Sequence, residues 1–149
     1  MGNGVEAVEA VRQLLAGEVP MAPDLGFAIV DTRDAAALHV KCLEEPGLAG
    51  ERFLAAGRFY KFIDVASMLK AGLPAEQTKK VPARVMPNFL VHILSLFNEG
   101  IRSIKSELGK SRHCDVSHAK ERLGWETRSA EESVIDCAKS LIEHGVVKT

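Results

Sequence analysis

A short apolar run leads directly into a helical pattern twice in this sequence, and this repeat constrains the fold more than any other feature. Residues 26–31 form a short apolar run with β-branched members that ends in the charged Asp31, as in a buried strand, and Asp34 opens a helix over about 34–45. Residues 51–57 predict a second strand, and a helix over about 61–71 follows it. The order of these elements predicts an α/β fold with a mixed or parallel sheet.

The remaining segments predict further helices and one edge strand. Helical spacing covers residues 4–16. Residues 80–84 predict a short edge strand, because Pro82 cannot donate a hydrogen bond to a central ladder. A helix that begins at Pro87 and reaches Phe97 is apolar nearly all round, so it must be covered on most sides.

Capping residues and apolar stripes place the other helices. Ser117 is expected to cap a helix over 118–123, and Ser129 with Glu132 forms a capping box before the last helix. About six helices and few short strands are therefore expected, an α+β arrangement for the isolated chain. The helix over 34–45 is expected to bury one stripe at helical spacing: Ala36, Val40 and Leu43.

Composition excludes several classes of protein. The chain has 149 residues, 46% of them hydrophobic and 26% charged, which predicts one globular domain over residues 1–149. Its 19 Lys and Arg nearly balance its 20 Asp and Glu, so no nucleic-acid partner is expected. The longest apolar stretch, residues 89–97, is too short for a membrane span. Cys42, Cys114 and Cys137 cannot all pair, and this indicates a reducing cytoplasm.

Two motifs resemble catalytic or cofactor signatures but lack their context. Residues Gly2 to Ala7 match G-x-G-x-x-A, yet the dinucleotide fingerprint needs a strand immediately before it. Ser117 to Lys120 match S-x-x-K without the companion motifs of penicillin-binding enzymes. The residue patterns therefore predict no cofactor-binding residue and no catalytic residue.

Four potential metal ligands lie close together in the sequence, namely His113, Cys114, Asp115 and His118. Their spacing matches no zinc pattern, and adjacent residues of an extended chain point to opposite sides. No metal site is therefore predicted.

The order of the segments resembles the second half of extended short-chain dehydrogenases/reductases. The likeness includes residues 27–41 and 50–57, then Val81-Pro-Ala-Arg, Pro87-Asn-Phe-Leu-Val, Ser117-His-Ala-Lys-Glu-Arg-Leu-Gly-Trp125 and Arg128-Ser-Ala-Glu-Glu-Ser-Val. These segments occur in the family's order and cover roughly residues 5–147. Among NAD-dependent epimerase/dehydratase proteins, the chain is most similar to the dihydroflavonol-4-reductase-like (aldehyde reductase) branch. This resemblance implies a carbonyl substrate and NAD(P)H in the full-length family.

The chain departs from this family in its catalytic residues. The family's glycine-rich loop is missing. The Tyr-x-x-x-Lys pair is missing too, because the single tyrosine, Tyr60, is followed four residues later by Asp64 instead of lysine. The resemblance therefore implies the C-terminal, substrate-binding part of a Rossmann-type reductase, inactive alone, with its nucleotide-binding half as a partner. A stand-alone binding or assembly module without turnover is the alternative.

Two groups of residues are the candidate sites. An apolar substrate wall is expected from Val19, Pro20 and Met21 together with Phe89, His92 and Ile93. Asp31, Arg33 and Asp34, between a strand and a helix, are expected either to cap and pair or to face the substrate. Asp34→Ala should cost roughly 0.5–2 kcal/mol if Asp34 is the N-cap. The unpaired edge of residues 51–57 predicts a homo-oligomer.

Overall fold

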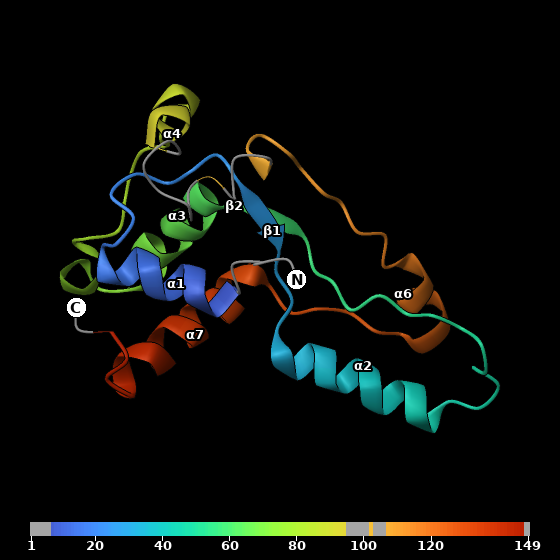
Figure 1. Cartoon of the computed structure of the whole chain (residues 1–149). Helices are drawn as coiled ribbons and strands as arrows, with labels where there is room; N and C mark the ends of the chain where they lie inside the picture. The colour runs from blue at the N-terminus through green and yellow to red at the C-terminus, as the bar shows by residue number, and fades with distance from the viewer. Residues whose placement is uncertain (1–6, 95–101, 103–106, 148–149) are drawn as a thin grey trace.

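The regular elements of the described structure are helices and two short strands (Figure 1). The computed structural model describes residues 7–94, 102 and 107–147. Within these residues it is mixed α/β with six α-helices, which confirms the expected fold class. The elements are α1 (Ala7–Ala16), β1 (Gly26–Ala28), α2 (Thr32–Glu44), β2 (Phe59–Lys61), α3 (Phe62–Gly72), the 3-10 helix η1 (Ala75–Thr78), α4 (Asn88–Leu94), α6 (Ser117–Leu123) and α7 (Ala130–Glu143).

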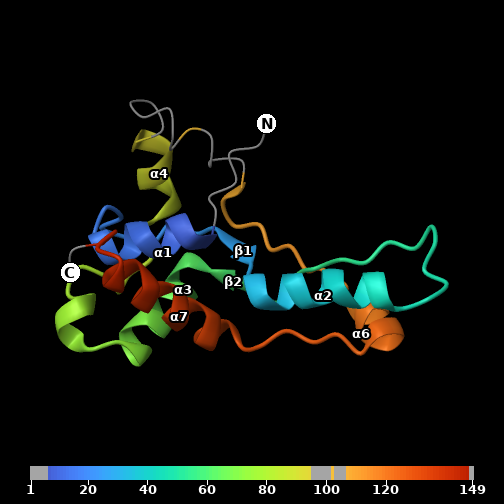
Figure 2. The same cartoon turned by 90° about the horizontal axis from the view of Figure 1, so that it is seen from below.

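The main core lies where α1, α3 and α7 pack together (Figure 2). Leu14 and Leu15 of α1 and Leu69 of α3 are fully buried, as is Ala138 of α7. Burying each large apolar side chain contributes roughly 1.5–3 kcal/mol, so this three-helix contact is the principal source of stability. The helices predicted over about 61–71 and after Ser129 are confirmed as α3 and α7.

A second, smaller cluster joins α2 to α6, at a distance from the main core (Figure 1). Leu38 of α2 packs there with Ala119 and Leu123 of α6 and with Trp125. The indole N–H of Trp125 donates a 2.7 Å hydrogen bond to the carbonyl oxygen of Asp34. This bond satisfies the polar atom of a buried aromatic side chain and fixes α6 against the first turn of α2.

The two strands form an antiparallel pair, so the expectation of a mixed or parallel sheet is wrong. Gly26 pairs with Lys61, and Ala28 pairs with Phe59. A Cβ at position 26 would lie 2.3 Å from the carbonyl oxygen of Tyr60, so only glycine permits this close pairing.

The second predicted strand, residues 51–57, is extended but belongs to no ladder. The strand β2 begins two residues later, at Phe59. Phe53 and Ala55 pack against the small cluster of α2 and α6 instead. Phe53 and Ala55 are therefore apolar because one face of this extended segment is buried. In the described structure the segment pairs with no strand.

The predicted edge strand over 80–84 is also wrong. Only a single bridge forms there, between Ala22 and Val85. The predicted cover of the helix after Pro87 is wrong too, because Phe89 and Ile93 of α4 are 64% and 50% exposed. Its continuation to Phe97 lies outside the described residues.

The start of α2 and its buried face differ from the predictions. Asp31, not Asp34, is the N-cap: its carboxylate accepts the backbone N–H of Arg33 at 2.8 Å. The helix buries Asp34 and Leu38. The predicted stripe of Ala36, Val40 and Leu43 lies on the exposed side.

Ser117 is the first residue of α6 rather than its cap. Its backbone N–H donates to the carboxylate of Asp115 at 2.9 Å. Ser129 does cap α7, accepting the backbone N–H of Glu132 at 3.1 Å. The Glu132 side chain completes no capping box, because it faces Arg128, whose guanidinium lies 3.4 Å away.

Candidate functional site

The loop proposed to contact substrate lies beside the segment that leads into α4. The backbone N–H of Ala22 donates to Arg84 at 3.0 Å, and the N–H of Met86 donates to Ala22 at 2.7 Å. These bonds place the end of the loop with Val19, Pro20 and Met21 next to the approach to α4. The exposed side chains of Phe89 and Ile93 follow within two turns of that approach. The side chain of His92 lies outside the described part of the chain.

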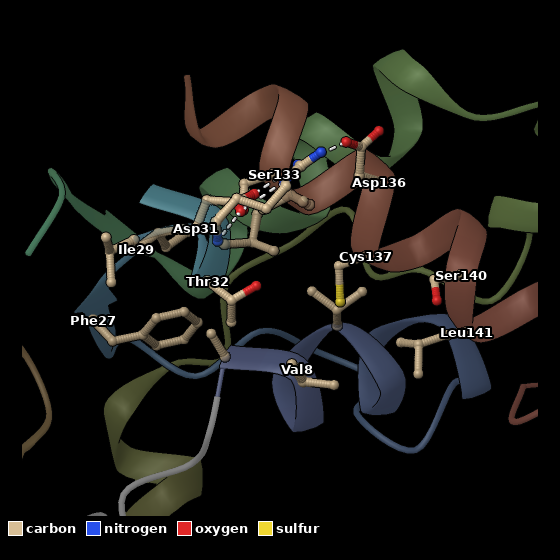
Figure 3. A pocket seen from close by; sticks show the side chains of 16 residues that line it. Val8, Phe27, Ile29, Asp31, Thr32, Ser133, Asp136, Cys137, Ser140 and Leu141 are labelled. Atoms are coloured by element: carbon tan, nitrogen blue, oxygen red, sulfur yellow. Dashed lines mark hydrogen bonds and ion pairs between the residues drawn. The ribbon is translucent and has the colours of Figure 1, made fainter. Parts of the chain in front are cut away.

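A separate pocket of about 440 Å³ opens between α1, β1, the first turn of α2 and α7 (Figure 3). Apolar side chains make up much of its lining. They include Val8 of α1, Phe27 of β1, Ile29 directly after β1, and Leu141 of α7. Its volume is within the range of small-molecule sites, roughly 300–1,000 Å³. Five residues of the predicted substrate wall have described side chains, and none of these five lines the pocket: Val19, Pro20, Met21, Phe89 and Ile93.

Charged side chains form one side of the pocket. The Arg33 guanidinium donates to both oxygens of Asp31, at 2.9 and 2.8 Å, and to Asp136 of α7 at 2.8 Å (Figure 3). The Arg33 hydrogen bonds hold the pKa of the Asp31 carboxyl well below its ordinary value. Arg33 therefore links the start of α2 to α7 and leaves Asp31 ionised at neutral pH.

Cys137 is the candidate nucleophile of the pocket, because its sulfur lies among the lining side chains (Figure 3). Burial raises the pKa of its thiol, and the Asp31 carboxylate raises it further. A thiol in such surroundings stays protonated at neutral pH and is a poor nucleophile. The pocket therefore has the chemistry of binding, without an activated nucleophile.

Asp34 and Arg128 form a buried connection outside the pocket. The Asp34 carboxylate accepts the backbone N–H of Arg128 at 2.8 Å and its guanidinium Nη2 at 2.8 Å. The hydrogen bonds from Arg128 lower the pKa of the Asp34 carboxyl. Asp34 and Asp31 thus both pair with arginines. The Asp34 carboxylate binds Arg128 and so holds α2 to the segment before α7.

Sequence reasoning missed Arg128 and Asp136 as partners of this charged cluster. Arg128 stands directly before the N-cap Ser129, and Asp136 stands on an exposed side of α7. Their partners lie about a hundred residues away, so no local spacing could pair them. The only local signal of this region was Ser129, whose capping role indicated where α7 begins.

The potential metal ligands of the sequence do not meet. His118 faces Glu51 at 3.0 Å and stacks on Phe53, whereas His113 faces Ser111. Among the described residues, no group of three or more His, Cys, Asp or Glu side chains is placed to hold a metal ion. In the same part of the chain, no helix has the length and apolar character needed to cross a membrane.

Comparison with known proteins places the fold. No family model matches the chain, and neither does any curated protein. The crystal structure of gox2253 superposes with a TM-score of 0.70 at 22% identity, over 95% of this chain and 44% of that one. This superposition shows that the two chains share a fold over the matched region. A second structure, SsCR_L211H, superposes with a TM-score of 0.63 at 20% identity, over 92% of this chain and 36% of that one. The chain thus spans less than half the length of either protein.

Proposed function

We propose that the chain is the substrate-binding portion of an NAD(P)H-dependent oxidoreductase that acts on a carbonyl, an aldehyde or ketone. The proposal rests on the resemblance to the dihydroflavonol-4-reductase-like branch of extended short-chain dehydrogenases/reductases. The fold likeness to two longer proteins, each matched over less than half its length, supports a role as one portion of a larger unit.

One observation carries the substrate role. Two segments more than 60 positions apart, the loop ending at Ala22 and the residues just before α4, are held together by backbone hydrogen bonds with Arg84 and Met86. Phe89 and Ile93 beside them are large apolar side chains left uncovered. A substrate wall needs this combination of fixed backbone and free apolar surface, whereas a core helix would bury both side chains.

The junction between β1 and α2 does not have the features that hold a nucleotide. A pyrophosphate binds at a helix N-terminus reached through a glycine-rich turn after a strand. Here β1 leads into α2 through Ile29, Val30 and Asp31 without a glycine, and the Asp31 carboxylate already occupies the helix N-terminus. Its negative charge would repel phosphate. The chain's own contribution is therefore to bind and orient the carbonyl compound, while hydride and proton donors belong to another unit.

Titration of the isotopically labelled chain with benzaldehyde, followed by NMR, tests this role. Amide signals of residues 19–21 and 88–93 should shift, and Phe89→Ala should weaken the response at least several-fold. Val40→Ala, which trims an equally exposed side chain on α2, is the matched control and should leave binding unchanged. Shifts confined to other residues, or equal binding by Phe89→Ala, would contradict the proposal.

A stand-alone binding module is the second candidate, and the pocket beside Cys137 favours it. Among the described residues, this chain supplies both the apolar and the charged sides of the pocket. In a Cys42→Ser, Cys114→Ser background, a small aromatic ligand in the pocket should slow labelling of Cys137 by a thiol reagent. Protection at Cys137 without shifts at residues 88–93 would favour the module over the reductase portion.

We also propose a cytoplasmic location. Its support is that all three cysteines, Cys42, Cys114 and Cys137, are unpaired thiols.

A further inference from the structure

The pocket beside Cys137 has an apolar inner wall that belongs to the main core. Val11 of α1 and Val65 of α3 line it, and they are 3% and 1% exposed. Val134 of α7 lines it as well and is also buried. The contact of these three helices fixes the wall. An apolar group that enters the pocket leaves water and meets packed side chains, which favours its binding.

The other side of the pocket is charged, and its charges do not balance (Figure 3). Asp31 is matched by Arg33, whose guanidinium donates to both of its oxygens. Asp136 receives one hydrogen bond from Arg33, at its Oδ2. In the part of the chain that the structure describes, no side chain donates to the Oδ1 of Asp136. Asp136 therefore presents a free acceptor oxygen and an unmatched negative charge to the pocket.

The charged side chains connected to Asp136 are negative as a group. Arg128 lies 3.7 Å from Asp31. It also binds Asp34 at 2.8 Å and faces Glu132 at 3.4 Å. Among the described residues, the connected group contains four carboxylates and two guanidinium groups: Asp31, Asp34, Glu132, Asp136, Arg33 and Arg128. Its excess negative charge attracts a cation and repels an anion.

Two hydroxyl groups border the pocket between its apolar and charged sides, those of Thr32 and Ser140 (Figure 3). A hydroxyl oxygen can accept a hydrogen bond, and a carboxylate can only accept. A protonated amine has N–H donors and no acceptor, so these groups complement it. Arg33 is less suited to hold an anion, because the two carboxylates that it already binds would repel one.

We propose that this pocket binds a small organic amine, with its protonated amino group beside Asp136 and its apolar body against Val11, Val65 and Val134. The inference gives a ligand class to the pocket that favours a stand-alone module. It is independent of the carbonyl role, which concerns residues 88–93.

Three probes that share a phenyl body test this charge preference: 2-phenylethylamine, 2-phenylethanol and phenylacetate. NMR titration of the labelled chain at neutral pH follows the amide signals of residues 133–141 and gives a Kd for each probe. The amine should bind roughly three- to five-fold more tightly than the alcohol, as a partly exposed ion pair allows, and phenylacetate should bind most weakly. In the Cys42→Ser, Cys114→Ser background, the amine should also slow labelling of Cys137 by a thiol reagent.

Asp136→Asn keeps the shape of the side chain and removes its charge, so the amine and the alcohol should then bind about equally. Glu143→Gln makes the same change in net charge at an exposed position of α7 outside the pocket, and the preference for the amine should persist. Amide signals of the core helices show that both variants are folded.

Four outcomes would overturn the inference: no binding of the amine, shifts confined to residues outside the pocket, equal or tighter binding of phenylacetate, or a preference for the amine that survives Asp136→Asn. None of them affects the carbonyl role, because benzaldehyde shifts at residues 88–93 are measured separately. Loss of those shifts, in turn, would leave an amine site beside Asp136 standing.

Discussion

Replacing Asp34 tests whether the link between α2 and the segment before α7 is a principal support of the fold. Asp34→Ala removes the acceptor of the Arg128 backbone N–H at 2.8 Å and of its guanidinium at 2.8 and 3.1 Å. Hydrogen bonds to a charged group contribute about 1.5–3 kcal/mol each, and the exposed quarter of the Arg128 side chain regains part of this from water. We expect a loss of about 2–4 kcal/mol in the free energy of unfolding.

This loss exceeds what an N-cap at Asp34 would give, since capping residues contribute roughly 0.5–2 kcal/mol. Urea unfolding at neutral pH measures it, with the m-value held constant as the check for two-state behaviour. Asp136→Ala, which removes an exposed partner of Arg33, is the control and should change little. Arg128→Ala added to Asp34→Ala should cost little more. A loss below about 1 kcal/mol for Asp34→Ala, or one equal to that of Asp136→Ala, would refute the reasoning.

Four other outcomes follow from the structure. Arginine hydrogen bonds lower the pKa of the Asp31 and Asp34 carboxyls in the folded state. The two carboxylates therefore stabilise the fold fully above their unfolded pKa near 4, and this stabilisation is lost as the pH falls below that value. The urea midpoint should drop in that acidic range, and it should drop less steeply in Asp34→Asn. Leu43→Lys should change stability by under about 0.5 kcal/mol, whereas Leu38→Ala should cost about 2–5 kcal/mol; equal costs would contradict the exposure of the α2 stripe. Calorimetric titration of the isolated chain should show NADH and NADPH binding no tighter than millimolar, and micromolar binding would reveal a nucleotide site in this chain. Light scattering should show self-association of the isolated chain through residues 51–57, weakened by Leu54→Lys; a clean monomer would favour the stand-alone module.

Local patterns predicted the helices that form the main core. Phe62 and Leu69 of α3 and Val134 of α7 are buried at helical spacing, and Ser129 caps α7 as expected. These features depend on residues within one or two turns of each other. For that reason a single sequence contains enough information to place them.

Predictions failed where the outcome depends on distant partners. The predicted burial of Ala36, Val40 and Leu43 is wrong, because Leu38 on the other side of the helix meets Trp125, a partner that no local pattern indicates. Residues 51–57 have a strand's composition without a strand to pair with in the described structure. The charged site was predicted as a cluster, yet its partners Arg128 and Asp136 come from the far end of the sequence.

The small cluster between α2 and α6 has a consequence for hydrogen exchange. Four residues are buried in it, far fewer than a unit needs to stay folded by itself. Its order depends on the Trp125 and Arg128 contacts with Asp34, so this region opens at a lower free energy than the core of α1, α3 and α7. Amide protons of α2 and α6 therefore exchange with solvent sooner than those of α3. Because this cluster joins the two helices, any contact that holds one of them in place slows exchange across both.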